Sequence, residues 1–350
     1  MNGKTDGRKK SAYAAAGVDI DEMMSGLAAE KRMVRRTATP GVLSDIGTFG
    51  GLFAAPTGRG EILVASTDGV GTKLKVAWMM GRHDTVGRDL VNHCVNDILV
   101  QGARPLFFLD YVGMARLSGR VFSQIVKGLC RACRENGCAL LGGETAEMPG
   151  LYPDGEYDLV GTIVGSVNRK DLITGETIRP GDVMLGLRST GLQTNGYSLA
   201  RKVLFETAGL SVNDLLPGTR RKVGDILLAV HGSFLKPVTA LRRAVKIRGM
   251  AHITGGGLVD NVPRVLPEGT SARIDRTAWS VPTVFRFIQE AGGVDTDEMY
   301  RVFNMGIGFV VIVRKREAER SLEILRRSGG RPVRIGEIVE GRRRVIFADQ

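Results

Sequence analysis

The chain has 350 residues, of which 43% are hydrophobic and 25% charged, a composition typical of a globular protein long enough for two separately packed domains. No apolar run approaches the ~20 residues that cross a bilayer, and the N-terminal residues lack the apolar segment of a signal peptide. The sequence therefore argues against a membrane protein and predicts a cytoplasmic one.

The formal net charge of +12 makes a nucleic-acid-binding protein the alternative from a different functional class. Residues 1–10 hold four basic residues and one acidic residue, and residues 314–344 hold eleven basic and five acidic. Neither segment interleaves aromatic side chains for base stacking. We interpret the excess charge as solvated surface and expect no nucleic-acid partner.

In chain order, residues 1–12 are expected to form a disordered tail and residues 19–36 a helix. The glycine-dense segment 40–51 either connects elements or folds over a ligand as a lid. Residues 13–170 are expected to form an N-terminal domain, a sheet with helices packed on it. Its expected strands are residues 62–67, 106–112, 139–141 and 159–167, and its expected helices are residues 85–101 and 121–136.

A turn-rich stretch at residues 171–182 marks the start of a second domain, expected over residues 171–350. Its expected strands are residues 183–187, 272–274, 309–313 and 333–338, and its expected helices are residues 198–207, 235–245, 281–291 and 317–327. The mixture of strands and helices predicts a two-domain fold of the α+β or α/β class.

The four cysteines raise the question of a metal or redox site, because Cys130 and Cys133 form a C-x-x-C pair with Cys138 nearby and Cys94 upstream. Cys133 recurs at helical spacing from Leu129 in the expected helix 121–136. We therefore interpret the thiols as small core residues on or beside the buried stripe, which one equivalent of tightly held zinc in purified protein would contradict.

The most informative stretch is an apolar strand that runs into a glycine turn. Gly69 and Gly71 would let backbone N–H groups approach anionic oxygens, Lys73 would neutralise them, and Asp68 would hold the Mg²⁺ that accompanies a polyphosphate. The spacing is not that of a Walker A loop. The alternative is an ordinary β-turn with a solvated Asp and Lys.

The expected helix 85–101 is apolar apart from a polar stripe. Asp89, His93 and Asp97 fall at i, i+4 and i+8 on one face. Such a stripe beside core positions costs free energy unless a cation or a lysine pairs with it, or unless water solvates that face. His93 is the weakest candidate for a functional role, because a lone histidine is more often structural.

A second short strand ends in glycines followed by Glu144. Asp68, Asp97 and Glu144 could therefore supply the oxygen ligands that Mg²⁺ prefers. A third glycine loop precedes an expected helix near residue 258 and offers N–H groups for a phosphate; its residues are Thr254, Gly255, Gly256 and Gly257. His252 stands two residues before this loop.

Six segments of the chain carry a common pattern, namely residues 14–21, 67–73, 95–98, 142–150, 194–198 and 252–257. Taken together they resemble the phosphoribosylformylglycinamidine cyclo-ligase family, and the likeness runs in order from about residue 13 to near the C-terminus. The resemblance implies a homodimer whose N-terminal sheets pair across subunits, a mixed α/β C-terminal domain, and an ATP site in the cleft between the domains.

The resemblance also implies a reaction. ATP would phosphorylate the formyl amide oxygen of formylglycinamidine ribonucleotide, and the amidine-side nitrogen would close on that carbon to give 5-aminoimidazole ribonucleotide, ADP and phosphate. Lys31 matches a lysine associated with the nucleotide site, and Asp97 and His252 match positions thought to serve catalysis, with Lys73 supporting charge neutralisation. His252 would act as a general acid or base or polarise the amide; the alternative is a structural histidine that braces the glycine loop. The implied nucleotide contacts are Lys31, Gly69, Gly71, Thr72, Lys73, Asn195 and the loop from Thr254 to Gly257.

The sequence departs from the family pattern at two positions. Gln193 stands where many members carry a histidine, which excludes proton transfer at that point while leaving hydrogen bonding open. Gly232 stands where the family often has an arginine, so a phosphate contact could have moved to His231 or Lys236. Related ATP-dependent enzymes, thiamine monophosphate kinase and selenophosphate synthetase, are the alternatives within the superfamily. Selenophosphate synthetase expects a reactive cysteine in its N-terminal glycine loop, and none precedes Cys94.

Overall fold

The computed structural model describes residues 11–18, 21, 25, 33–45, 48–57 and 60–348. The expected tail at residues 1–12 and the expected helix at residues 19–36 fall largely outside these ranges, as does Lys31. The described part of the N-terminal region includes the one-turn helix α1 (Ala12–Ala15), which Ser11 caps by accepting a hydrogen bond from the Ala14 N–H at 3.1 Å.

The first half of the chain builds a five-stranded sheet with the strand order β1-β2-β5-β3-β4. These strands are β1 (Gly51–Ala54), β2 (Glu61–Gly69), β3 (Arg104–Met114), β4 (Ala139–Glu147) and β5 (Tyr157–Asn168). All neighbours are antiparallel except β3 and β4, which are parallel. A parallel pair needs a crossover connection, and α5 (Gly119–Asn136) provides it.

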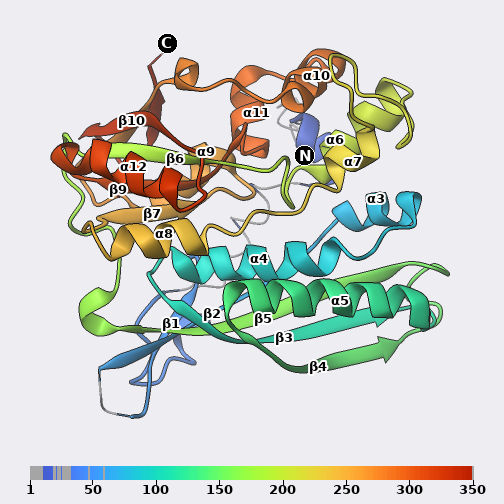
Figure 1. Ribbon diagram of the computed structural model, residues 1–350, viewed down its shortest axis with the longest axis horizontal. Coiled ribbons are helices and arrows are strands. Elements are labelled where there is room, and N and C mark those ends of the chain that lie inside the picture. The colour runs from blue at the N-terminus through green and yellow to red at the C-terminus, as the bar shows by residue number, and fades with distance from the viewer. Residues whose placement is uncertain are drawn as a thin grey trace, which may run out of the picture.

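One face of this sheet is covered by α4 (Val86–Leu99) and α5, which lie side by side across it (Figure 1). The strand β5 alternates buried residues toward the helices with half-buried ones on the other face, as a strand covered on one side requires. No helix lies on the opposite face in Figure 1. The described residues thus leave that face of the sheet uncovered.

The second half of the chain builds a six-stranded sheet with the order β11-β8-β10-β6-β9-β7, antiparallel except for the β11–β8 pair. Its strands are β6 (Val183–Arg188), β7 (Gly249–His252), β8 (Thr270–Ile274), β9 (Ile307–Val313), β10 (Pro332–Glu340) and β11 (Val345–Phe347). The strand β9, which lies between β6 and β7, is buried at every residue. The helix α12 (Ala318–Arg327) packs on β6 and β10, and α8 (Leu235–Arg242) lies between α12 and α4.

The remaining elements connect these layers. They are α3 (Lys73–Met80), η1 (Arg169–Asp171), α6 (Tyr197–Arg201) with the π-helical turn η2 (Lys202–Thr207), α7 (Val223–Leu227), α9 (Gly257–Asn261), η3 (Val262–Val265), η4 (Arg276–Ala278), α10 (Thr283–Gly292), α11 (Thr296–Val302) and η5 (Lys315–Glu317). The structure confirms two α/β sheet units, with short elements such as β1, β7 and β11 that the sequence did not predict.

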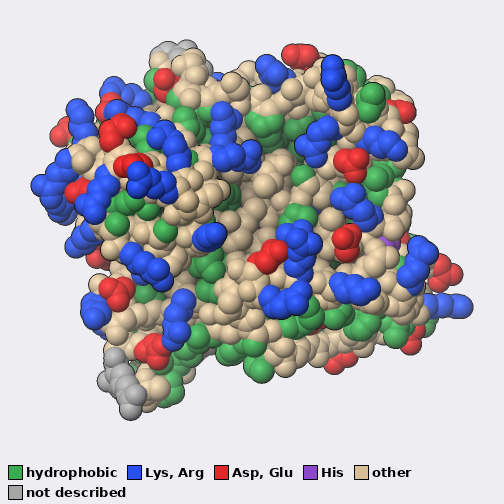
Figure 2. Space-filling view, in the orientation of Figure 1, with side chains coloured by type: hydrophobic (Ala, Val, Ile, Leu, Met, Phe, Trp, Pro, Cys, Tyr) green, Lys and Arg blue, Asp and Glu red, His purple; other side chains and the backbone are tan. Residues whose placement is uncertain are grey.

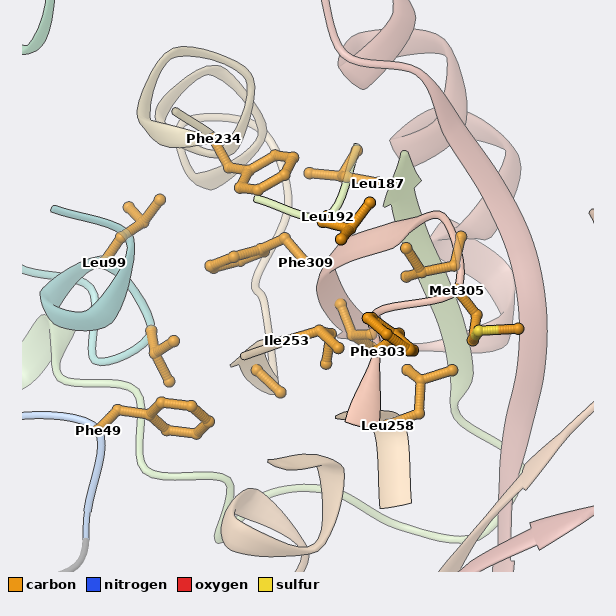
Figure 3. Packing of buried hydrophobic residues seen from close by; sticks show 14 of the residues in the cluster. Phe49, Leu99, Leu187, Leu192, Phe234, Ile253, Leu258, Phe303, Met305 and Phe309 are labelled. Atoms are coloured by element: carbon orange, nitrogen blue, oxygen red, sulfur yellow. The ribbon is translucent and has the colours of Figure 1, made fainter. Parts of the chain in front are cut away.

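The polar stripe of α4 is the surface on which the second half of the chain docks. The Asp89 carboxylate accepts a hydrogen bond from the His231 N–H at 2.6 Å, and the Asn92 and Asn96 amides donate to the carbonyls of His231 and Gly232 at 2.7 and 2.9 Å. Apolar side chains complete the interface: Figure 3 shows Phe49 and Leu99 on the side facing Phe309. The stripe is therefore paired with protein groups rather than solvated.

The strand β4 is longer than the sequence predicted, and this changes the meaning of its glycines. Residues 139–141 were expected to form a short strand ending in a glycine turn, but the strand continues to Glu147. Gly143 pairs with Asp110 on β3, and a Cβ on Gly143 would lie 2.3 Å from the Asp110 carbonyl oxygen. This glycine therefore permits a close strand–strand approach.

None of the described helices is long and apolar enough to cross a membrane. The basic C-terminal segment lies around α12 and β10, where Figure 2 shows Lys and Arg interspersed with Asp and Glu. Arg327 pairs with Glu323 and Arg273 with Glu337 across this surface. The mixed charge agrees with the interpretation of solvated surface.

Candidate active site

A cavity of 360 Å³ lies between the two halves of the chain. The first half contributes the loop residues Thr48–Gly51, the end of β2 and part of α4, and the second half contributes Thr254 and Arg264. Part of the glycine-dense loop 40–51 therefore forms a wall of the cavity. The Gln101 side-chain amide holds this wall by donating a hydrogen bond to the Gly50 carbonyl at 2.9 Å.

Asp68 lines this cavity together with Asp45 and Asp97, and its side chain is 40% exposed, against 45% for that of Asp45. Asp68 ends β2, where the Gly69 N–H donates to its Oδ1 at 2.7 Å and its Oδ2 lies 2.8 Å from His93 Nε2. Burial alone would lower the pKa of His93, but the carboxylates of Asp68, Asp97 and Asp89 together outweigh it and raise that pKa to about 9, with Asp68 contributing most. The ion pair with His93 lowers the pKa of Asp68, although the burial of Asp68 opposes this shift.

Behind these two residues, side chains from both halves join in a ring of four hydrogen bonds that one longer ion-pair contact closes. His93 Nδ1 lies 2.7 Å from Thr194 Oγ1, and Thr194 Oγ1 lies 3.3 Å from His231 Nδ1. His231 Nε2 lies 3.0 Å from His252 Nε2, and His252 Nδ1 lies 2.8 Å from Asp97 Oδ1. Asp97 returns to His93 Nε2 at 3.7 Å.

Asp68 and Asp97 determine which atoms of the ring carry protons, because an ionised carboxylate only accepts hydrogen bonds. His252 Nδ1–H donates to Asp97, so the Nε2 of a neutral His252 accepts from His231 Nε2–H. His231 Nδ1 then accepts from the Thr194 hydroxyl, which accepts from His93 Nδ1–H. This assignment leaves His93 doubly protonated, in agreement with its raised pKa.

The two inner histidines are neutral in this arrangement. Burial lowers the pKa of His231 well below its ordinary value, and it also lowers that of His252 despite the opposing effect of Asp97. His252 is fully buried, and both of its ring nitrogens are engaged. The expectation that His252 acts on substrate directly does not agree with this geometry. Instead, His252 donates a hydrogen bond to Asp97 and positions that carboxylate.

Sequence comparison decides the family. Residues 51–167 match the family described as "AIR synthase related protein, N-terminal domain", and residues 179–349 match its C-terminal domain. The phosphoribosylformylglycinamidine cyclo-ligase of Alkaliphilus metalliredigens (strain QYMF) is 47% identical over 97% of this chain and 99% of its own length. The chain belongs to the phosphoribosylformylglycinamidine cyclo-ligase family. The enzyme of that name from Geobacter metallireducens (strain ATCC 53774 / DSM 7210 / GS-15) is 50% identical over 95% of this chain and 97% of its own.

Solved structures of other enzymes share the cyclo-ligase fold. Thiamine-monophosphate kinase from Stenotrophomonas maltophilia K279a gives a TM-score of 0.63 at 16% identity, covering 92% of this chain and 95% of its own. The hydrogenase maturation protein HypE in complex with ATP gives a TM-score of 0.60 at 21% identity, covering 93% of this chain and 90% of its own. At these identities the likeness shows the fold alone.

Lys73 does not lie where a cyclo-ligase phosphate contact was expected. Its side chain is 0% exposed, its Nζ lies 2.9 Å from Asp89 Oδ2, and it donates hydrogen bonds to the carbonyls of Ala229 and Gln193 at 2.7 and 3.1 Å. Burial lowers the pKa of Lys73 and raises that of Asp89, and each is partly offset by the other's charge. In this geometry Lys73 joins the two halves, and its contact with a phosphate stays a prediction.

Glu144 does not converge with Asp68 and Asp97. The register places Asp68 on β2 opposite Gly161 on β5, and β3 then separates β5 from β4. Three strand spacings amount to about 14 Å, whereas ligands of one cation each lie within about 2.5 Å of it. Glu144 is exposed on the edge strand, and within this chain it cannot share a cation with Asp68.

The glycine loops lie beside the cavity rather than around it. Gly71 takes a φ of 67° in the turn before α3, and the Thr72 hydroxyl lies 3.2 Å from that of Ser198. A Cβ on Gly257 would lie 2.0 Å from the Tyr300 carbonyl oxygen, so this glycine is needed for packing against α11. Of the loop 254–257, Thr254 reaches the cavity wall.

Gly255, Gly256 and Asn195 lie behind Thr254. A Cβ on Gly255 would meet the Asn195 amide oxygen at 3.3 Å, and Gly256 takes a φ of 94°. Asn195 donates a hydrogen bond to Thr194 Oγ1 at 3.4 Å. These three residues therefore support the ring and its adjoining loop, and their contact with a nucleotide stays a prediction.

Sequence reasoning gave too little weight to three groups. Thr194 was only part of a matched segment, and His231 was considered for a phosphate contact rather than for its position beside His252. Arg264 was missed; its guanidinium lies 5.1 Å from the Phe49 ring centroid and lines the cavity. It follows the third glycine loop by seven residues, and no local pattern marked it.

Proposed function

We propose that this protein catalyses the ATP-dependent cyclisation of formylglycinamidine ribonucleotide to 5-aminoimidazole ribonucleotide, with release of ADP and phosphate, in de novo purine biosynthesis. As a member of the cyclo-ligase family, the chain is a ligase that forms a carbon–nitrogen bond. The observation that carries this proposal is identity of 47–50% to named cyclo-ligases along nearly the whole of both chains.

The proposed site for ATP and the ribonucleotide is the cavity between the two halves. Its 360 Å³ falls in the range of small-molecule sites, ~300–1,000 Å³. Support comes from the convergence there of an exposed carboxylate, a protonated histidine and an arginine, namely Asp68, His93 and Arg264. Two cations in a partly enclosed cavity suit a polyphosphate, whose charge a phosphoryl transfer must neutralise.

Asp68 is the group best placed to hold Mg²⁺. Hard cations prefer oxygen ligands and keep several waters, and Ser66 and Thr254 line the same cavity as Asp68. These donors fit a magnesium ion, which when bound would neutralise charge on the phosphate being transferred. Asp97 also lines the cavity, but its oxygens already accept hydrogen bonds from His252 and Ser66. We assign Asp97 the role of positioning the side chains of the ring.

The protein's part in ring closure is to hold the activated carbon against the attacking nitrogen and to accept a proton. The hydrogen-bonded ring fixes His93 with its Nε2–H directed at Asp68. Because its members come from both halves of the chain, the ring also fixes how the halves meet at the cavity. His231 and His252 are positioning residues in this proposal.

The test is an assay of purified protein with formylglycinamidine ribonucleotide, ATP and Mg²⁺, in which 5-aminoimidazole ribonucleotide and ADP are both measured. We expect both products, formed only when the ribonucleotide is present. A parallel reaction with thiamine monophosphate tests the alternative that the fold relatives suggest. ADP formation with thiamine monophosphate, and none with the ribonucleotide, would overturn the proposal.

We further propose that the protein is a homodimer whose uncovered sheet faces pack together. Leu109 on β3 and Leu141 on β4 are 37% and 64% exposed on the face opposite α4 and α5. Val160, Thr162 and Val164 of β5 alternate onto the same face. Large apolar side chains on an uncovered sheet favour association. A monomer by light scattering at assay concentration would contradict this part.

A further inference from the structure

Three of the four cysteines surround an open cavity of 910 Å³ beside α5. Cys133 is buried, Cys138 is partly buried and Cys130 is exposed. The expectation placed these thiols on or beside the buried stripe of the helix, and Cys130 lies on its exposed side. The cavity shares no wall residue with the one between the two halves, so the proposed reaction does not use these thiols.

The end of α5 brings two of the thiols together. The Gly137 N–H donates to the Arg134 carbonyl at 3.2 Å, and the Cys138 N–H donates to the Cys133 carbonyl at 3.0 Å, with Gly137 at a φ of 68°. These two bonds form a Schellman motif, in which the side chains at C3 and C″ characteristically contact each other. Cys133 and Cys138 occupy those positions, and both line the cavity.

The surroundings give the two thiols different reactivity. The neighbouring Cys133 thiol lowers the pKa of the Cys138 thiol, while Cys138 and then burial raise the pKa of Cys133. Lys127, Arg131 and Arg134 line the cavity, and Lys and Arg side chains lie over α5 on the face shown in Figure 2. Nearby cations favour a thiolate, and they would attract a reagent that carries carboxylates.

A metal site fits these thiols less well. Among the described residues, the cluster of His93, Asp97 and His252 is the one group whose potential ligand atoms all lie within 4.8 Å of one another. The three cysteines do not gather in this way, although the Schellman motif brings Cys133 and Cys138 together. The geometry therefore suits chemistry between two sulfurs better than coordination by three.

We propose that Cys138 and Cys133 form a redox-active dithiol that exchanges with small-molecule disulfides such as glutathione disulfide. The Cys138 thiolate attacks one sulfur of glutathione disulfide, which forms a mixed disulfide and releases one glutathione thiolate. Cys133 then loses its proton and attacks the Cys138 sulfur, which forms the Cys133–Cys138 disulfide and releases the second glutathione. The dithiol is oxidised by two electrons, one glutathione disulfide is reduced to two glutathiones, and the two thiol protons end on them.

The chain offers a direct test, because trypsin cleavage after Lys127, Arg131 and Arg134 places the three cysteines on three different peptides. Folded protein is incubated with glutathione disulfide, free thiols are alkylated, and the tryptic peptides are identified by mass spectrometry. We expect a linked pair of peptides containing Cys133 and Cys138, which dithiothreitol separates. Absence of that pair in the wild-type protein, or its formation only after the protein is unfolded in urea, would overturn the proposal.

Variants assign the two roles. In Cys133→Ser the resolving thiol is missing, so Cys138 should retain glutathione as a stable mixed disulfide. In Cys138→Ser neither the linked pair nor glutathione at Cys133 should form. The control Cys130→Ser should keep the linked pair at the wild-type yield. Glutathione bound at Cys130 alone, with both other thiols free, would show that exposure rather than the paired geometry governs reaction and would refute the proposal.

Discussion

Replacing Lys73 by methionine separates the two roles considered for this lysine. The substitution keeps most of the side chain's volume and removes the charge that pairs with Asp89, while both side chains are fully buried. Removing one partner of a buried ion pair costs about 3–5 kcal/mol, because the other charge stays buried without compensation. The Ala229 and Gln193 carbonyls also lose a donor. We expect Lys73→Met to lower the free energy of unfolding by about 3–5 kcal/mol.

Urea denaturation followed by fluorescence or circular dichroism measures this loss. The matched control is Lys75→Met, two residues along α3. Lys75 pairs with Glu156 at 2.6 Å, but its side chain is 39% exposed, and such surface pairs contribute about 0–1 kcal/mol. The reasoning is refuted if Lys73→Met unfolds at the wild-type urea concentration while its KM for ATP rises, since that result is expected of a phosphate ligand.

The same variant has a predicted pH dependence. Burial raises the pKa of Asp89, and the charge of Lys73 opposes that shift, so the substitution should raise the pKa further. A carboxyl group whose pKa is higher in the folded state stabilises the fold below its unfolded pKa and loses this contribution as the pH rises through the folded pKa. The loss of unfolding free energy in Lys73→Met should therefore grow as the pH rises above the ordinary Asp pKa of about 4.

Three further predictions concern the ring and the uncovered sheet. Asp97→Asn should lower kcat and leave the half-saturating Mg²⁺ concentration unchanged, because both carboxylate oxygens accept hydrogen bonds from Ser66 and His252; a higher Mg²⁺ requirement would place Asp97 among the metal ligands. His231→Phe leaves the buried His252 Nε2 without a donor and should cost about 1–3 kcal/mol in urea unfolding as well as lowering kcat, whereas wild-type kcat would show that turnover does not need the closed ring. Leu109→Arg should convert the dimer to a monomer in light scattering, and a persistent dimer would locate the interface elsewhere.

The sequence predicted elements best where one side of a helix or strand is buried. Residues 121–136 and 159–167 correspond to α5 and β5 within a few residues, because periodic burial leaves its pattern in the chain. The junction at residues 139–150 was misread for a physical reason. Glycine permits both a turn and a close approach between strands, and only the register with β3 shows that Gly143 serves the second purpose.

The candidate site was predictable in part. The ends of β2 and α4 could be recognised from carboxylates that follow apolar runs, and Asp68 and Asp97 do line one cavity. The partners of these residues come from the other half of the chain, so no local pattern could reveal them. Lys73 illustrates the limit: a lysine in a glycine turn suggests a phosphate ligand, but its burial against Asp89 depends on how the two halves dock.

The most direct test of the account compares wild-type protein with Asp68→Asn in one assay that measures 5-aminoimidazole ribonucleotide and ADP together. The account predicts equal amounts of both products from the wild type. It predicts a fall in kcat of about 10²–10³-fold in Asp68→Asn, the size typical of losing one preorganised electrostatic contact, with the urea unfolding midpoint showing that the variant is folded. Wild-type turnover by Asp68→Asn would contradict the placement of the reaction in this cavity.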